Sequence, residues 1–395
     1  MSNSLPPRVY ISVFGSGLGH AARMIPVGNS LAEQGMDVLF SSSSEAVDLI
    51  RKSGFQCFET PSIDVAWAPD GSVAPLRITI RRITKNIPTF WRQVGIEMRR
   101  MNKLRPQIVL ADSKLSTIIA AKLLGIPTIL VLNQLRILLP DDVKTRMRTV
   151  LERLTTEVLS ILWNLSKCIV IPDLPPPYTI ALRNTSGIIL GRRKIKFVGF
   201  ITKNNHIDED ECHLLRERLK ITKRTPLVFA QISGPPPTKK PLIEAVTHSA
   251  KDLQKYCVIV VSEGDPHGNE DPVWEGWGWR YGWCPENETL FTLADLLVIR
   301  GGHSSISKAL LSSKPVVVVP IERHSEQYHN AIRLNSLEVG LVVEQKNLPN
   351  GSLVDAIKSI STDDKFKISA KRLGAIAVRM NGVKGIVEEV HKHLR

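Results

Sequence analysis

A glycine-containing turn in the second half of the chain has the residues best suited to hold a phosphorylated ligand. Residues 300–302 (Arg-Gly-Gly) follow a short apolar stretch, and residues 303–305 (His-Ser-Ser) open a predicted helix. Glycines let backbone N–H groups approach a ligand closely, and a helix N-terminus concentrates unpaired N–H donors. Ser304 or Ser305 is expected to cap this helix. The pattern predicts a phosphate or diphosphate site, although an ordinary strand–turn–helix unit has the same composition.

A histidine and an aspartate in the first half have the types and placement of a general-base pair. His20 stands where the loop GSGLG, after an apolar strand, runs into a helix, and Asp112 ends another strand. A carboxylate at the same sheet edge can hold the imidazole tautomer and stabilise its protonated form. A lone histidine at such a place is more often structural. A dinucleotide site is the weaker alternative, because the next strand ends in Ser41–Ser44 instead of an acidic residue.

Both groups of residues are expected at the carboxyl ends of parallel strands. Apolar strands alternate with helices up to about residue 200, and the alternation starts again at residue 227. This order predicts the fold class α/β, with two Rossmann-like doubly wound domains facing across a cleft that holds the ligand. The expected domains are residues 1–200 and 201–378, with a final helix in 379–395 returning toward the first domain.

The charge of the chain is concentrated in its first half. The net charge is +14, and residues 1–200 hold 26 Lys and Arg against 14 Asp and Glu. An excess of this kind predicts an anionic partner. No recognised RNA- or DNA-binding module is present, so a nucleic acid is not expected to be that partner. Five scattered cysteines, no leader sequence and no apolar run of about 18 residues predict a cytoplasmic protein.

A basic amphipathic insertion is predicted in residues 75–105. Leu76, Ile80, Ile83 and Ile87 share one helical face, basic residues occupy the others, and the pattern resumes after Pro88, which is expected to separate two helices. Such a helix pair can lie on an anionic membrane surface. The alternative is a surface helix that packs on its own domain and exposes a solvated basic face.

With these residues assembled, the chain resembles the GT-B glycosyltransferases that use nucleotide sugars. The resemblance is to the UDP-glycosyltransferases and to the bacterial N-acetylglucosaminyltransferase of the lipid-linked peptidoglycan precursor. It is strongest over residues 281–331, where YGWCPENETLF…RGGHSS…PIERHSEQYHN resembles the donor signature of the family. The resemblance implies that residues 1–200 bind the acceptor and residues 201–378 bind the donor.

The resemblance also implies roles for single residues. His20 matches the catalytic base and Asp112 its partner, while Gly17 and Gly19 belong to the acceptor loop. Trp283 would stack on the uracil, Arg300 would stabilise the leaving diphosphate, and Glu326 and Gln327 would contact the sugar hydroxyls. The complete set expected to bind the donor is Ser233, Gly234, Trp283, Glu286, Arg300, Gly301, Gly302, His303, Ser304, Ser305, Glu326 and Gln327.

One residue departs from the family pattern. Lys308 stands where the family usually has a glutamate that accepts hydrogen bonds from the ribose hydroxyls, and a lysine has no acceptor. Three interpretations remain open: Glu286 binds the ribose, Lys308 contacts a phosphate, or the nucleotide is not UDP.

The function expected from the resemblance is inverting sugar transfer from a UDP-sugar to a hydroxyl, without metal or cofactor and with His20 as the base. The basic first half and the insertion at 76–105 favour a lipid-linked or phosphorylated acceptor at the inner face of an anionic membrane. A soluble small-molecule acceptor is the alternative within the same class. A nucleotide-sugar 2-epimerase and a non-catalytic partner subunit are the alternatives outside it.

Overall fold

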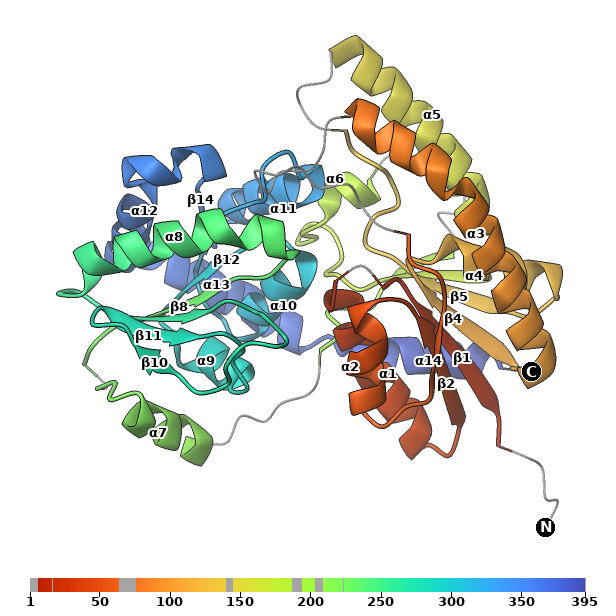
Figure 1. Ribbon diagram of the computed structural model, residues 1–395, viewed down its shortest axis with the longest axis horizontal. Helices are drawn as coiled ribbons and strands as arrows, with labels where there is room; N and C mark the ends of the chain where they lie inside the picture. Colours follow the sequence, from red (N-terminus) through yellow and green to blue (C-terminus); the bar gives the residue numbers. More distant parts are fainter. Residues whose placement is uncertain are drawn as a thin grey trace. The chain divides into compact units, whose positions relative to one another are not determined.

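Parallel strands and helices alternate along the chain and build two separate sheets (Figure 1). The computed structural model describes residues 6–15, 17–63, 76–139, 145–186, 194–202, 209–222 and 224–394, with the backbone alone at 76–80, 82, 83 and 145. The chain divides into two compact units, with boundaries at residues 203/204 and 379/380. The first unit contains the N-terminal sheet and the last helix, and the second contains the other sheet.

The first sheet has seven strands, all paired in parallel, in the order β3-β2-β1-β4-β5-β6-β7. Their bounds are β1 (Arg8–Val13), β2 (Asp37–Ser42), β3 (Cys57–Glu59), β4 (Ile108–Asp112), β5 (Thr128–Val131), β6 (Cys168–Ile171) and β7 (Ile195–Phe197). The strands are almost continuously apolar, as expected of a parallel sheet covered on both faces. Helices of the unit are α1 (Gly19–Glu33), α2 (Glu45–Lys52), α3 (Leu76–Leu104), α4 (Leu115–Leu123), α5 (Thr145–Trp163), α6 (Leu182–Thr185) and α14 (Gly382–His393).

The two faces of this sheet have separate cores. On one face, Val9 and Ile11 of β1 pack with residues of α1, α2 and α14. On the other face, Tyr10 of β1 packs with residues of α3 and α4. This alternation follows from the two-residue period of a strand, which also decides on which side each polar residue at the strand end lies.

The second sheet has the order β10-β11-β9-β8-β12-β13-β14, parallel except for the β10–β11 pair. Its strands are β8 (Leu227–Gln231), β9 (Val258–Ser262), β10 (Val273–Trp274), β11 (Gly278–Tyr281), β12 (Leu296–Ile299), β13 (Val316–Val318) and β14 (Gly340–Val342). The helices are α7 (Glu209–Arg218), α8 (Pro236–Leu253), α9 (Asn287–Leu293), α10 (His303–Leu311), α11 (Ser325–Ser336), the 3-10 turn η2 (Gln345–Asn350), α12 (Ser352–Thr362) and α13 (Asp364–Val378).

The insertion differs from its prediction. It is one helix of 29 residues, α3, that continues through Pro88. A proline removes one N–H from the hydrogen-bond ladder, which a long helix packed on its neighbour can tolerate. The side chains of Leu76, Ile80 and Ile83 lie outside the described residues. Among the described helices, none is long and apolar enough to cross a membrane.

Candidate functional site

The first unit joins His20 to Asp112 at the carboxyl edge of its sheet. His20 Nδ1 lies 2.9 Å from Asp112 Oδ1. The two residues meet because Asp112 ends β4, next to Val13 at the end of β1, and α1 begins just before His20. The His20 side chain is 26 % exposed, whereas Asp112 is fully buried. The imidazole is therefore partly open to solvent, while its Nδ1 contacts a buried carboxylate.

The glycines of the loop shape this approach. Gly17 has a φ of 81°, in the left-handed region that glycine adopts without strain, and Gly19 is the first residue of α1. A Cβ at Gly15 would collide with the backbone of Ser43, so the loop can pass β2 only with a glycine there. The predicted roles of Gly17 and Gly19 toward an acceptor stay predictions.

Arg23 is a third member of the pair that the sequence analysis missed. Its Nε donates to Asp112 Oδ2 at 2.6 Å, and its Nη2 contacts both Asp112 Oδ1 and, at 3.1 Å, His20 Nδ1. The spacing of three residues from His20 on one helix was a usable signal, because residues i and i+3 share a helical face. Arg23 gives the buried carboxylate a permanent positive partner.

The charge state of Asp112 follows from this surrounding. Burial by itself raises the pKa of a carboxyl group, but the charges of Arg23 and His20 and their hydrogen bonds outweigh it, so the pKa of Asp112 lies well below its ordinary value. Asp112 is therefore ionised throughout the physiological range. It can fix the orientation of the His20 ring and stabilise a positive charge on it.

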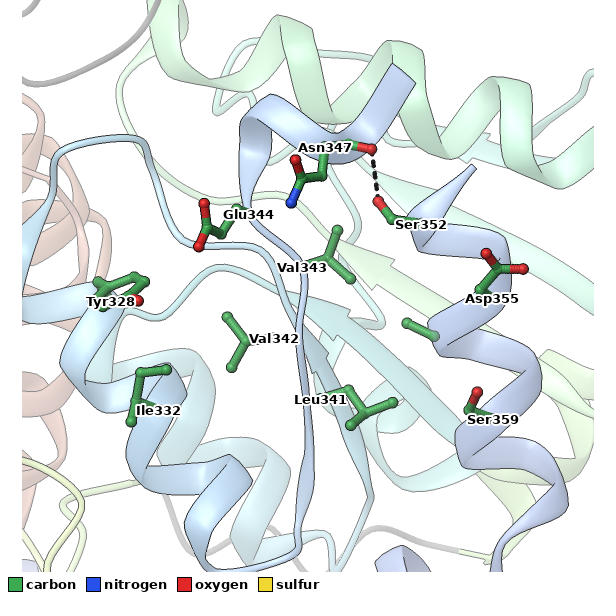
Figure 2. A pocket seen from close by; sticks show the side chains of 11 residues that line it. Tyr328, Ile332, Leu341, Val342, Val343, Glu344, Asn347, Ser352, Asp355 and Ser359 are labelled. Carbon is green, nitrogen blue, oxygen red and sulfur yellow. Dashed lines mark hydrogen bonds between the residues drawn. The ribbon is translucent and has the colours of Figure 1, made fainter. Parts of the chain in front are cut away.

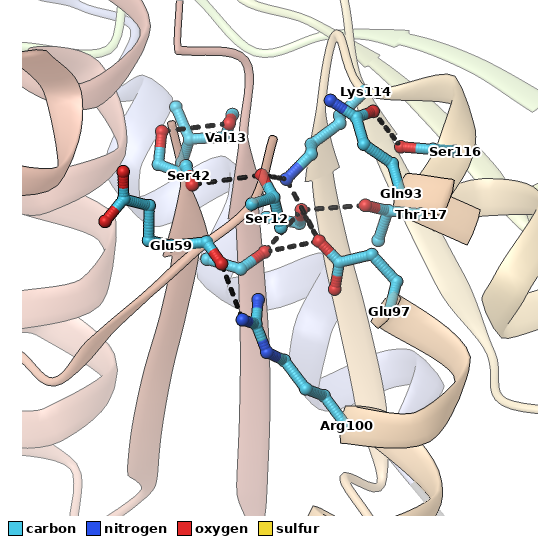
Figure 3. A network of polar contacts seen from close by, with 12 residues as sticks. Ser12, Val13, Ser42, Glu59, Gln93, Glu97, Arg100, Lys114, Ser116 and Thr117 are labelled. Carbon is cyan, nitrogen blue, oxygen red and sulfur yellow. Dashed lines mark hydrogen bonds and ion pairs between the residues drawn. The ribbon is translucent and has the colours of Figure 1, made fainter. Parts of the chain in front are cut away.

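A network of buried polar residues lies between the first sheet and α3 (Figure 3). The Glu97 carboxylate of α3 accepts hydrogen bonds from Tyr10 Oη at 2.6 Å, Ser41 Oγ at 2.8 Å and Lys114 Nζ at 3.0 Å. Lys114 immediately precedes α4 and follows β4 by two residues. The network thereby connects α3 to the chain segment that carries Asp112.

In the second unit, three loops meet at the carboxyl ends of the neighbouring strands β8, β12 and β13. A Cβ at Gly301 would collide with the backbone of Gln327, and Asn330 Nδ2 donates to Gly301 O at 3.1 Å. Gly234, with a φ of 119°, lies against Thr238 and Ile321. Gln327 Oε1 accepts from Ile321 N at 3.0 Å. The structure thus brings together the predicted donor residues of three separate loops.

The start of α10 differs from its prediction. Gly302 occupies the N-cap position without a side-chain cap, so neither Ser304 nor Ser305 caps the helix. Ser305 Oγ instead donates to Gln231 Oε1 at 2.9 Å. His303 is buried, Ser304 is half-buried, and a Cβ at Gly302 would meet open space. Without a cap, the first N–H groups of α10 are suited to an anion.

Arg300 lies inside the second unit. Its side chain is fully buried, Nη1 donates to Val319 O and Gln345 Oε1 at 3.0 Å each, and Nη2 donates to Thr238 O. Burial lowers its pKa to about 10, so the guanidinium remains charged. Its Nε has no hydrogen-bond partner among the described residues, and its contact with a diphosphate stays a prediction. Arg300 ties the start of the loop after β12 to the first turn of α8, to the loop after β13 and to η2.

The remaining donor residues have specific partners. Lys308 forms an ion pair with Glu288 of α9, and Glu286 forms one with Arg218. An acidic group therefore stands beside Lys308 although position 308 itself is basic. Trp283 is half-buried, with its backbone N–H bonded to Asn269 O at 3.0 Å, and Ser233 and Glu326 are also half-buried.

A pocket of about 480 Å³ lies elsewhere in the second unit. Leu341 and Val342 of β14 form its floor, and α11 and α12 flank it (Figure 2). Glu344 and Asp355 line it as well. The pocket lies at β14, an edge strand of the sheet, and the loops after β8 and β12 do not line it, so it is not the predicted donor site.

Comparisons with known proteins identify the class. Residues 239–386 match the profile of the glycosyltransferase family 28 C-terminal domain. An uncharacterized glycosyltransferase of Methanosarcina mazei is 25 % identical over 402 residues, covering 98 % of each chain. A shorter match, 28 % identical over 116 residues (28 % of this chain and 31 % of the relative), is to the UDP-N-acetylglucosamine–N-acetylmuramyl-(pentapeptide) pyrophosphoryl-undecaprenol N-acetylglucosamine transferase of Parabacteroides distasonis.

Solved structures establish the fold. The glycosyltransferase of kitacinnamycin superposes with a TM-score of 0.71 at 15 % identity, covering 99 % of this chain and all of the other. Streptomyces sp. SF2575 glycosyltransferase SsfS6, complexed with thymidine diphosphate, gives a TM-score of 0.66 at 17 % identity, covering 98 % and 99 % of the two chains. The chain has the GT-B fold. The resemblance to GT-B glycosyltransferases is confirmed, and the protein is a glycosyltransferase.

Proposed function

We propose that the protein transfers a sugar, with inversion, from a UDP-sugar to a hydroxyl group of a lipid-linked or membrane-associated acceptor, with His20 as the general base. The observation that carries the proposal is the His20–Asp112 hydrogen bond of 2.9 Å at the carboxyl edge of the first sheet. It leaves the Nε2 edge of a partly exposed imidazole available to a substrate.

The proposed step uses the atoms of this pair. Asp112 holds the tautomer with a proton on Nδ1, so Nε2 removes the proton of the acceptor hydroxyl. The acceptor oxygen attacks the anomeric carbon, and the bond from that carbon to the diphosphate oxygen breaks on the opposite side. The imidazolium that forms is stabilised by the ionised Asp112. The electron pair of the broken bond leaves with the nucleoside diphosphate.

The proposed donor site is the set of loops at β8, β12 and β13. Its N–H groups at the start of α10 would stabilise the charge that develops on the leaving diphosphate, a preorganised electrostatic contribution. A UDP-sugar is supported by the printed name of the Parabacteroides distasonis relative, and a nucleoside diphosphate by the thymidine diphosphate complex of SsfS6. Glu288, held by Lys308, is the acidic group proposed to accept from the ribose hydroxyls.

A membrane-bound acceptor is supported by how α3 extends past the sheet. Arg8 Nη1 donates to Leu104 O at the amino edge, and Ser116 Oγ donates to Gln93 Oε1 near the carboxyl edge. The helix spans about 43 Å against about 17 Å for the five residues of β4. Residues before Gln93 therefore extend beyond the edge that carries His20 (Figure 1). There, Ile87 and Trp91 are exposed, together with the basic residues Lys85 and Arg92.

Helix α5 adds an apolar stripe on the outside of the same unit. Its exposed apolar residues fall within an arc of about 80° at 100° per residue. They are 50–60 % exposed: Met147, Val150, Leu154, Val158 and Ile161. The opposite face of the helix carries the buried Glu152, Ser160 and Trp163. A helix with its apolar stripe outward and basic residues nearby fits the interface of an anionic bilayer, and hence the inner membrane face.

The experiment is a donor screen followed by transfer. Isothermal calorimetry with UDP-, dTDP- and GDP-sugars identifies the donor, and the strongest binder is then incubated with a membrane lipid extract. The proposal predicts UDP-sugar binding and a sugar label that moves into the lipid fraction. Transfer only to water-soluble acceptors would favour the soluble-acceptor alternative. An epimerised nucleotide sugar formed without any acceptor would favour the epimerase.

A further inference from the structure

Three potential metal ligands gather at the amino edge of the first sheet. Cys168 is the first residue of β6, and Glu389 and His393 lie one turn apart in the last part of α14. One donor atom from each residue lies within 4.8 Å of the other two. Asp112 ends β4, so this cluster and the His20–Asp112 pair lie at opposite edges of one parallel sheet.

One carboxylate oxygen of Glu389 has no hydrogen-bond partner among the described residues. Glu389 is 7 % exposed, and its Oε2 is buried without a hydrogen-bond partner among the described residues. This oxygen lies 3.7 Å from His393 Nε2. Tetrahedral zinc, with bonds of about 2.0–2.3 Å, separates its nitrogen, oxygen and sulfur donors by about 3.3–3.6 Å. The histidine and glutamate are therefore already close to the spacing of two zinc ligands.

We propose that Cys168, Glu389 and His393 form a binding site for Zn²⁺, with the fourth position open to water. Thiolate, imidazole and carboxylate are the three ligand types that zinc prefers in proteins. Binding replaces the proton of the Cys168 thiol by the metal, and the proton leaves to solvent. Cys168 is 2 % exposed and the His393 side chain is 26 % exposed, so an ion can enter from the histidine side.

Lys196 defines how the carboxylate is shared. Its Nζ is paired with Glu389 Oε1, so Oε2, which lies 3.7 Å from His393 Nε2, stays available to a metal ion. The ammonium group also repels a cation, so it lowers the affinity of the site for metal. This balance predicts a site of moderate affinity that removal of Lys196 would strengthen.

The bound ion would act on the fold. Ile386, Val387 and Val390 already pack α14 onto the core of the first unit. A metal bond from Cys168 to His393 would fix the last turn of the helix to β6 as well. Within the described part of the chain, no contact joins the site to the residues proposed for sugar transfer, so the inference stands independently of the proposed function.

The test uses the full chain after removal of metal with a chelator. Co²⁺ alone is added, and the absorption of thiolate–cobalt charge transfer is recorded, followed by competition with Zn²⁺ and a thermal melt. We expect one equivalent to bind, the charge-transfer band to appear, and the melting temperature to rise. Cys57→Ser, which alters a buried thiol of β3 outside the cluster, serves as the matched control and should keep the band.

The variants separate this site from adventitious binding. Cys168→Ser should abolish the band, and His393→Ala, at a partly exposed position in the last turn of α14, should weaken binding by about tenfold or more. Lys196→Met should bind more tightly than the unaltered chain. Absence of the band in the unaltered chain, or an equal band in Cys168→Ser, overturns the proposal. Weaker binding by Lys196→Met would contradict the placement of the ion at Glu389.

Discussion

Replacing Asp112 by asparagine is the most informative single change in the first unit. The substitution keeps the shape of the side chain and removes its charge. Asp112 is fully buried, and it neutralises Arg23, which is 8 % exposed. Asparagine would therefore leave the guanidinium buried beside a neutral amide. It would also place an N–H₂ group where the carboxylate now accepts hydrogen bonds from both His20 and Arg23.

The expected cost follows from the burial of both partners. Breaking a buried ion pair by removing one charge costs about 3–5 kcal/mol. For a unit of about 200 residues this corresponds to a melting temperature lower by about 6–20 °C, at about 2–4 °C per kcal/mol. Sugar transfer should fall by about 10²–10⁴-fold, because His20 loses the partner that holds its tautomer.

A double-mutant cycle separates the two effects. Arg23→Met combined with Asp112→Asn removes both buried charges, so the double variant should be more stable than the sum of the single losses predicts. Its transfer rate should nevertheless remain low, since no carboxylate faces His20. The assays are calorimetric melting and transfer kinetics on the same preparations. Additive stability losses, or normal transfer by Asp112→Asn, would refute the reasoning.

Three further predictions concern other parts of the structure. Burial raises the pKa of Glu97, but Lys114 and the hydrogen bonds outweigh it and hold the pKa below its ordinary value, so the stabilisation by the ionised carboxylate is present above about pH 4.3 and is lost as the pH falls. Glu97→Gln should therefore melt at a lower temperature at pH 7 and lose less stability between pH 5 and pH 3 than the unaltered chain. An unchanged dependence of the melting temperature on pH would argue against this. Arg300→Met leaves buried carbonyls unpaired, at a cost of about 1–3 kcal/mol each. Thermal melting and calorimetric titration with UDP should therefore show a less stable second unit and weaker donor binding. Unaltered melting temperature and UDP affinity would exclude the role of Arg300 in joining the loops. Val158→Glu should reduce sedimentation with anionic liposomes, whereas Thr155→Glu, at an exposed polar position of the same helix, serves as the control. Equal losses of liposome binding in both variants would point to charge alone. No loss of binding in Val158→Glu would remove α5 from the membrane contact.

Much of the fold follows from local patterns in the sequence. Apolar strands that alternate with helices predict both parallel sheets, because the strands of a parallel sheet are buried on both faces and are therefore apolar along their whole length. The meeting of His20 and Asp112 was also accessible, since parallel neighbours present their carboxyl ends at one edge. The close contacts of Gly234 and Gly301 could likewise be expected from the sequence, because a close approach of two backbone segments requires a residue without a side chain.

The departures concern the direction of side chains, which depends on distant parts of the chain. Arg300 follows a strand in a loop, and its acceptors belong to distant segments. They are the carbonyls of Thr238 and Val319 and the side-chain oxygen of Gln345. Likewise, periodicity identifies the apolar stripe of α5 but cannot say that the buried side is the one with Glu152, whose partners Arg136 and Leu139 lie in another loop. Lys308 departs from the family pattern, and its partner Glu288 becomes visible only when α9 and α10 are packed.

The most direct test of the central claim is a transfer assay with His20→Ala and the donor found by calorimetry. The account predicts that this variant binds the UDP-sugar with the affinity of the unaltered chain but no longer moves the labelled sugar to the lipid fraction. Transfer by His20→Ala at an unaltered rate would contradict the account and remove His20 from the chemistry.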